Sequence, residues 1–288
     1  MLAFLFHVAR NAACIKPVRV IEPVEEGNVL FRFTDELAHG VLLRADFALV
    51  EPRRRHDFRR ERAEEFLERG LTVEHAHDVI FLKASALGGG RDSFIDAAEL
   101  IEMAAMIESP CLIVHSGARG GHTHNHASRL FRMALEQLLP RAEEHNVALA
   151  IEPMHPGCAW EWTLLKTLED TAEILQQFPS PHLQLVYDMY HFPAPPQPLL
   201  EVLLPRMAIV QLGDACQPPH GEQNRCPLGE GEVPLGSLVC ELEALGYTGF
   251  YEVELRGEDV EALTYRELVE QSVEMFEHLM SSREPGAR

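Results

Sequence analysis

The sequence predicts an α/β protein built as a single (β/α)8 barrel, and three observations lead to this prediction. Short apolar runs recur along the chain, and four of them end in an oxygen-bearing side chain, namely Glu152, Asp188, Gln211 and Glu254. The intervals between these ends scatter about the ~31 residues per unit expected when about 250 residues form eight βα units. The chain has 288 residues, which one barrel can account for, and strand and helix patterns alternate without a marked domain boundary.

The apolar run at residues 147–151 is the clearest strand. Glu152 follows it, and Pro153 then ends regular strand pairing. A continuous apolar run is typical of a strand that is buried on both faces, as in a parallel sheet. Glu152 is therefore expected at the carboxyl end of its strand, where the other three side chains would converge with it at one mouth of the barrel.

The amino-terminal part of the chain fits this pattern least. Residues 1–28 match no βα unit and are expected to form an irregular extension, so the barrel domain is assigned to residues 29–288. Thr34 is placed to cap a short helix. The basic run at 53–62 could bind a phosphate, but a solvated loop and helix face is the favoured interpretation.

Turn and breaker residues delimit the other elements. Pro140 is expected to kink its helix, and Gly246 is placed as the C′ residue of another. Strands are expected at 29–33, at 46–51, within 71–81, and at 111–115, 147–151, 183–188, 207–211 and 250–254. Helices are expected at 35–44, 93–108, 127–145, 162–178, 235–245 and 262–282, with shorter ones ending at Gly70 and Arg206.

Composition limits the function classes. The hydrophobic fraction of 46% supplies a full core, and the net charge of −20 disfavours nucleic acid or an anionic membrane as a partner. The apolar start lacks the features of a signal peptide, and no run approaches the ~18 to 20 apolar residues of a membrane span. The six cysteines form no CxxC pair, which favours reduced thiols and a cytoplasmic protein.

Three histidines, His122, His124 and His126, follow the strand at 111–115. Their spacing is that of a metal-binding tract. Glycines flank them, however, in a loop where histidine can equally contact a polar substrate or cap the next helix. These readings stay open, and direct metal ligation is the least favoured of them.

Five motifs link the chain to a known family. They read EP at 152–153, YDMYH at 187–191, VQLGD at 210–214, NRCPLGEG at 224–231 and GYTGFYEVE at 246–254. In this order they resemble the sugar phosphate isomerase/epimerase family of xylose isomerase-like TIM barrels, which includes ketose 3-epimerases, hydroxypyruvate isomerase, inosose dehydratase and 3-dehydroshikimate dehydratase. The resemblance is good from about Cys111 to the carboxyl terminus, weaker from Val29 and absent before it.

The resemblance implies a divalent-metal site at four strand ends. In the family a Glu, an Asp, a His and a second Glu hold one ion, and the matching residues here are Glu152, Asp188, Gln211 and Glu254. Gln211 departs from the usual histidine, although its side-chain oxygen can still coordinate a hard cation. In the family the two glutamates also move a proton, one on each face of the substrate, so Glu152 and Glu254 are the implied catalytic acid and base.

Four further residues are candidate substrate contacts. His191 and Arg225 match family positions that contact substrate, while His115 lies at a strand end and His155 in the loop after Glu152. Arg225 could equally pair with a surplus carboxylate such as Glu222 or Glu230.

Three carboxylates and an amide suit Mn²⁺ or Mg²⁺ rather than structural zinc, with Co²⁺ and Zn²⁺ as alternatives. Such an ion, bridging a hydroxyl and a carbonyl oxygen, would stabilise an enediolate and acidify the adjacent C–H. The expected function is therefore a divalent-metal-dependent isomerase or epimerase of a small keto-sugar or related polyhydroxy ketone.

Other functions stay open. A dehydratase of an inosose or a dehydroshikimate would begin with the same proton abstraction. A three-zinc endonuclease needs more histidine ligands, and the charge of −20 argues against it. A barrel that binds a sugar without turning it over is motivated by Gln211 and the irregular residues 1–28. The expected partner is a small sugar, without nucleic acid or membrane, and a homo-oligomer is compatible with the sequence.

Overall fold

The computed structural model describes residues 2–7, 41–43, 72–76, 79–84, 91–106, 109–119, 121–221 and 223–281. The strands predicted at 29–33 and 46–51, most of the helix predicted at 35–44, the basic run at 53–62 and the helix ending at Gly70 lie outside these residues. The domain boundary after residue 28 therefore stays a prediction.

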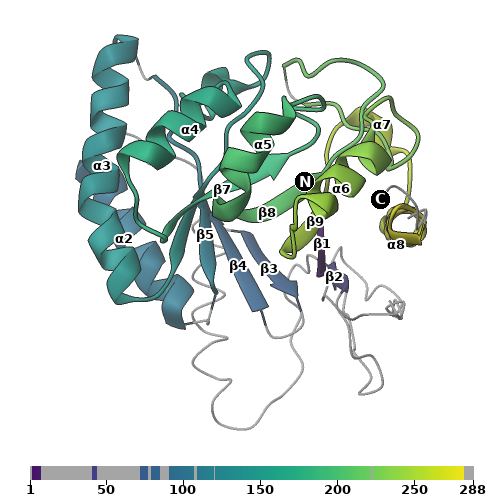
Figure 1. The fold of residues 1–288 in the computed structure, drawn as a ribbon, viewed down its shortest axis with the longest axis horizontal. Helices are drawn as coiled ribbons and strands as arrows, with labels where there is room; N and C mark the ends of the chain where they lie inside the picture. The colour runs from purple at the N-terminus through teal and green to yellow at the C-terminus, as the bar shows by residue number, and fades with distance from the viewer. Residues whose placement is uncertain are drawn as a thin grey trace, which may run out of the picture.

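Six parallel strands, paired in chain order and separated by helices, form the centre of the molecule (Figure 1). The strands are β4 (Val79–Ala84), β5 (Cys111–Val114), β6 (Ala148–Ile151), β7 (Leu183–Asp188), β8 (Met207–Leu212) and β9 (Phe250–Leu255). The intervening helices are α2 (Arg91–Met106), α3 (His124–Glu144), α4 (Leu168–Gln177), α5 (Gln197–Leu203) and α6 (Leu235–Ala244), with short 3₁₀ turns at Ala159–Glu161 and Leu204–Arg206. After β9 come α7 (Glu258–Glu261) and α8 (Tyr265–Ser281). The predicted α/β class is thus confirmed, with parallel strands curled as half of a TIM barrel.

Three antiparallel strands extend the two edges of this sheet. Strand β1 (Leu2–His7) pairs with β9 and with β2 (Val41–Leu43), and β3 (Thr72–Ala76) pairs with β4. Cα atoms of β3 come within 8 Å of both β1 and β2, so the curl of the sheet brings its two edges together. The amino-terminal segment thus contributes a strand to the barrel sheet.

Two sequence predictions are wrong in this region. The single strand predicted within 71–81 is instead β3 and the start of β4, which form an antiparallel pair. The helix predicted at 35–44 does not include Val41–Leu43, which is strand β2. Both errors arise from short apolar runs, whose periodicity does not distinguish a strand from a helix.

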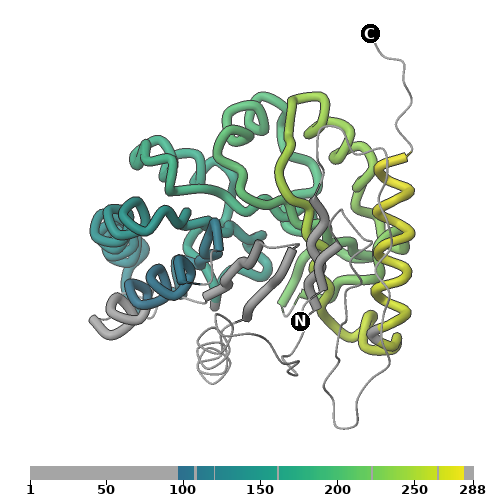
Figure 2. The backbone as a smooth tube through the Cα atoms, turned by 90° about the horizontal axis from the view of Figure 1, so that it is seen from below, coloured from purple at the N-terminus to yellow at the C-terminus, as the bar shows by residue number. Residues whose placement is uncertain are grey.

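Threonine caps explain why two helices begin later than predicted. Helix α4 starts at Leu168 rather than at residue 162, because the Thr167 side chain accepts a hydrogen bond from the backbone of Asp170 at 3.0 Å. Helix α8 is separated from α7, since Thr264 and Glu267 form reciprocal side-chain to backbone bonds of 3.3 and 2.8 Å. Figure 2 shows α8, in yellow, along one flank of the molecule, where it packs against α6.

The alternation of side chains along the parallel strands decides what points into the barrel. Successive residues of a strand face opposite sides. One set packs under the helices, and the other forms a small interior cluster of Cys111, Ile113, Ala148, Ala150, Val186 and Ile209. Two residues beyond the last members of this cluster, on the same face, stand Glu152, Asp188 and Gln211. Because side chains alternate between the two faces of a strand, these three polar side chains face the interior of the barrel.

No helix among the described residues is both long and apolar enough to cross a membrane.

Asp214 holds the loop that follows β8. Its carboxylate accepts four backbone N–H bonds: at Oδ1 from Ala215 (2.9 Å) and Val233 (3.1 Å), and at Oδ2 from Gly229 (2.9 Å) and Gly231 (3.0 Å). A Cβ on Gly231 would lie 2.1 Å from Oδ1, which explains the second glycine of the GEG motif. The backbone N–H of Cys226 also donates to the carbonyl of Asp214 at 3.1 Å. This loop carries Arg225, so Asp214 fixes the path of a residue that enters the barrel.

Replacing Asp214 with Ala is predicted to lower the free energy of unfolding by about 2–4 kcal/mol, because four partly buried N–H groups lose their acceptor. Urea denaturation of the full chain measures this. Glu173→Ala, at an exposed position of α4, is the control and should stay within about 0.5 kcal/mol of wild type. A loss below about 1 kcal/mol for Asp214→Ala would contradict the anchoring role.

Candidate functional site

The polar groups at the strand ends form a continuous buried patch. The pairing register sets Asp188 of β7 beside Gln211 of β8, and Gln211 beside Glu252 of β9. Glu254 lies two residues further along β9 on the same face, and Glu152 follows β6. All five residues are almost completely buried, with relative exposures of 3% or less.

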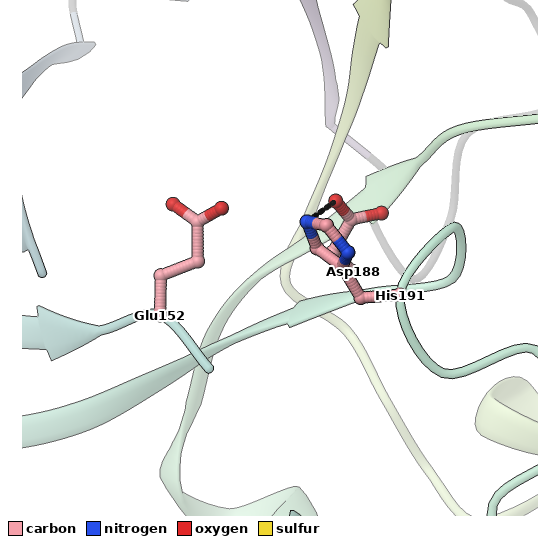
Figure 3. A group of neighbouring side chains, drawn as sticks. All are labelled: Glu152, Asp188 and His191. Atoms are coloured by element: carbon pink, nitrogen blue, oxygen red, sulfur yellow. Dashed lines mark ion pairs between the residues drawn. The ribbon is translucent and has the colours of Figure 1, made fainter. Parts of the chain in front are cut away.

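Glu152, Asp188 and His191 come close enough to share a ligand. Each offers one ligand atom, and these atoms all lie within 4.8 Å of one another. Figure 3 shows the two carboxylates projecting to the same side of their strands, with the imidazole beside Asp188 at an Nε2 to Oδ2 distance of 3.7 Å. His115 approaches Glu152 from β5, at 3.5 Å between Nε2 and Oε2. These distances bring together four of the residues that the sequence singled out.

Arg225 is the buried cation of the patch. Its Nη2 lies 2.7 Å from Asp188 Oδ2 and 3.1 Å from Gln223 Oε1, and 4.0 Å from Glu254 Oε2. The guanidinium also lies over the Tyr190 ring, 4.3 Å from its centroid. The sequence left open a pairing of Arg225 with Glu230, but the Glu230 carboxylate instead accepts from Gln271 at 2.7 Å. Glu222 lies outside the described residues.

A glycine makes room for this arginine. A Cβ added to Gly213 would lie 2.3 Å from Arg225 Nη1 and 2.8 Å from the Cβ of Tyr190. The glycine of the VQLGD motif is therefore required by the close approach of the guanidinium to the backbone of the loop after β8.

The charged side chains of the patch are buried, so each of them shifts the pKa values of its neighbours. Burial raises the pKa of Asp188, and the negative charge of Glu254 raises it further, while the nearby Arg225 lowers it. Burial also lowers the pKa of Arg225, but the carboxylates around it, Asp188 above all, outweigh this and raise it. Asp188 and Arg225 thus depend on each other for their charged forms.

Gln211 does not point its amide nitrogen at the other predicted ligands. Nε2 donates to Glu252 Oε2 at 2.8 Å, and the buried Oε1 has no hydrogen-bond partner in the part of the chain that the structure describes. Glu252 was not among the predicted site residues. Its signal was present in the sequence, because residues 252 and 254 of a strand share one face.

His155 and the histidines at 122, 124 and 126 have local contacts of their own. His155 is half-buried, and its Nδ1 accepts from the backbone of Gly157 at 3.1 Å, so it stabilises its own turn. The side chains of His122, His124 and His126 are at the amino end of α3, where Thr123 is the N-cap. Among the described residues, the group that combines three or more metal-ligand side chains is Glu152, Asp188 and His191, and the loop histidines are not in it.

The donor set suits a divalent cation. Glu152 and Asp188 supply carboxylate oxygens, and the Oε1 atom of Gln211 is a buried acceptor without a hydrogen bond among the described residues. Carboxylate and amide oxygens favour Mg²⁺ or Mn²⁺, while the imidazole of His191 would also suit Co²⁺ or Zn²⁺.

Known proteins share this architecture. A D-psicose 3-epimerase from Enterocloster bolteae is 28% identical over 116 residues, which are 40% of this chain and 36% of that protein, so the match spans about a third of its relative's length. The solved structure of the IOLI protein with a bound zinc atom has a TM-score of 0.61 at 19% identity and covers 72% of this chain and 77% of that one. A 3-keto-D-glucoside 4-epimerase from E. coli has a TM-score of 0.52 at 15% identity, covering 67% and 76%. At these identities the two structures support the fold alone.

The family match is broader than any of these relatives. The family described as xylose isomerase-like TIM barrel matches residues 42–279, which include every strand end of the patch. Parallel strands, inward carboxylates and the loop motifs around Asp214 all lie within that range. The chain belongs to the xylose isomerase-like TIM barrel family.

Proposed function

We propose that this protein is a divalent-metal-dependent isomerase or epimerase that acts on a small keto-sugar or related polyhydroxy ketone. The observation that carries the proposal is the buried group of Glu152, Asp188 and His191, whose ligand atoms lie within 4.8 Å of one another at the strand ends of the barrel. The similarity of part of the chain to a D-psicose 3-epimerase supports a ketose as substrate. Placement of the site at the carboxyl ends of the strands supports catalysis, because that face carries the active site in characterised barrels of this type.

The proposed ion would be held by Glu152, Asp188 and Gln211, with Glu254 and His191 as the remaining candidates. When bound, it would polarise the substrate carbonyl and acidify the neighbouring C–H. Mn²⁺ and Mg²⁺ fit the oxygen donors best, and the nearby imidazole keeps Co²⁺ and Zn²⁺ as alternatives.

The proposed reaction removes one proton from the substrate and returns another. The Glu152 carboxylate takes the proton from the carbon next to the carbonyl, and the electron pair stays on the substrate as an enediolate. Glu254, which comes from a strand three places along the sheet, starts the cycle protonated and gives its proton to that carbon or to its neighbour, which leaves Glu152 protonated. Exchange of protons with solvent then restores both residues. His115 would orient Glu152, from which it is 3.5 Å away, and His191 and Arg225 would donate to substrate oxygens.

A water-excluding environment supports this chemistry. The five polar residues at the strand ends are 3% exposed or less, and hydrogen bonds to charged groups are stronger where water is excluded. Dehydration of an inosose or dehydroshikimate would begin with the same proton removal, and the loss of water would then distinguish it.

Glu152→Gln is predicted to lower turnover by about 10²–10⁴-fold, because the amide cannot accept the substrate proton. Proton–deuterium exchange into D-psicose and other ketoses, followed by NMR in D₂O, measures this step directly. Glu173→Gln on the exposed face of α4 is the matched control and should leave the rate unchanged. Exchange by Glu152→Gln at the wild-type rate would show that Glu152 is not the base. Loss of water from 3-dehydroshikimate, seen as the new absorbance of an aromatic product, would replace the epimerase by a dehydratase.

Removal of divalent metal is predicted to abolish exchange. After dialysis against EDTA, the protein should lose activity and regain it when about one Mn²⁺ or Mg²⁺ ion is bound per chain. Co²⁺ and Zn²⁺ are tested separately. Full activity in protein shown by elemental analysis to be metal-free would contradict the proposed mechanism.

Arg225→Met is predicted to lower the free energy of unfolding by about 3–5 kcal/mol, because the buried Asp188 would lose its cation and would be left either charged and unpaired or protonated. Arg225→Lys keeps the charge but loses the second donor, so its loss should be smaller. Urea denaturation of the two variants and wild type compares these losses. A loss below about 1 kcal/mol for Arg225→Met would show that the ion pair is not a structural element of the barrel.

A further inference from the structure

Gln211 and Glu252 form a buried pair, and the proposed reaction gives Glu252 no role. Their Cα atoms are register partners on β8 and β9, and the Gln211 Nε2 to Glu252 Oε2 distance is 2.8 Å. The exposures are 0% for Gln211 and 1% for Glu252. Burying an additional carboxylate inside the barrel carries an energetic cost, so a function for Glu252 is needed.

An amide that serves as a metal ligand must present its oxygen, and not its nitrogen, to the ion. The two ends of the Gln211 amide have nearly the same shape but opposite hydrogen-bonding character, since one is an oxygen acceptor and the other an NH₂ donor. Both orientations therefore fit the same space. Only the bonds that the amide makes can decide which end faces the neighbouring Asp188 and which faces Glu252.

Glu252 decides between them. A carboxylate oxygen accepts a hydrogen bond from the NH₂ group, whereas a turned amide would set two oxygens against each other in a buried place. With Nε2 held by Glu252, Oε1 is directed away from it, and this buried oxygen has no hydrogen-bond partner among the described residues. Oε1 is thereby presented as an acceptor within the patch that holds Asp188.

We propose that Glu252 is a positioning residue, which fixes the amide of Gln211 so that its oxygen serves as a ligand of the divalent cation. The inference rests on the proposed metal site and explains how glutamine can act at a strand end where the family has histidine. Carboxylates that orient a metal ligand through its other polar atom act in the same way at histidine sites, and their loss weakens metal binding by about 10–100-fold.

Glu252→Gln tests this, because it keeps the shape but allows either orientation of both amides. Titration of the metal-free full chain with Mn²⁺, with free Mn²⁺ measured by electron paramagnetic resonance, should show an affinity about 10–100-fold below wild type, while thermal unfolding stays within a few degrees. Glu201→Gln is the matched control. It removes the charge from the exposed Gln197–Glu201 pair, of 3.3 Å, and should leave Mn²⁺ affinity unchanged.

A double-variant cycle separates positioning from simple charge. Gln211→Ala alone should weaken Mn²⁺ binding, and adding Glu252→Gln to it should cost little more, because the residue to be oriented is gone. If Glu252→Gln instead weakens binding by the same factor in both backgrounds, Glu252 acts through its charge and the inference is wrong. Unchanged affinity in Glu252→Gln also overturns it.

Gln211→His provides a test that leaves Glu252 intact. An imidazole can donate from one nitrogen to Glu252 and offer the other to the ion, so Mn²⁺ affinity should be kept or raised relative to wild type. A loss as large as that of Gln211→Ala would contradict the inference even if Glu252→Gln failed to fold. A wild-type chain that binds no Mn²⁺, Mg²⁺, Co²⁺ or Zn²⁺ would instead refute the proposed metal site on which the inference rests.

Discussion

The burial of acidic side chains at one end of a parallel sheet is the constraint on which this structure depends. Five carboxyl groups of the described residues are buried there or in the loop beside it: Glu152, Asp188, Asp214, Glu252 and Glu254. A buried carboxylate is costly unless it is paired or hydrogen-bonded. Arg225 is buried among these acids, and its single positive charge does not balance five carboxylates, which leaves an excess of negative charge. That excess favours a divalent cation.

Asp214, Asp188 and Glu152 have different partners, and these partners indicate which of the three acids have a structural role and which has a catalytic one. Asp214 is surrounded by four backbone N–H groups, which makes it a structural anchor. Asp188 pairs with Arg225, whose backbone N–H in turn bonds to the carbonyl of Arg256 at 2.7 Å. This bond joins the loop after β8 to the loop after β9. The Glu152 carboxylate lies 3.5 Å from the imidazole of His115, which can itself take up or release a proton.

Much of this arrangement could be predicted from the sequence, because it follows from local periodicity. A strand that ends in an apolar run places its next inward residue at the barrel mouth, and this was sufficient to place Glu152, Asp188 and Gln211. Side-chain pairing could not be predicted in the same way. Arg225 has several acids within reach along the sequence, and its choice of Asp188 depends on Gly213 and on the path of a loop. Glu252 shares the inward face of its strand with Glu254, so its position could be inferred, but its pairing with Gln211 on another strand could not.

The edges of the sheet were also beyond the sequence patterns. A short apolar segment such as Val41–Leu43 becomes a strand because β1 offers it a partner, which tertiary contact alone decides.

The proposed metal site is tested most directly by crystals of the protein soaked in Mn²⁺, with diffraction measured at a wavelength where manganese scatters anomalously. We expect one strong peak in the anomalous difference map, about 2.0–2.6 Å from oxygens of Glu152, Asp188 and Gln211. A peak at the histidines of the loop before α3, or none in the barrel, would contradict it.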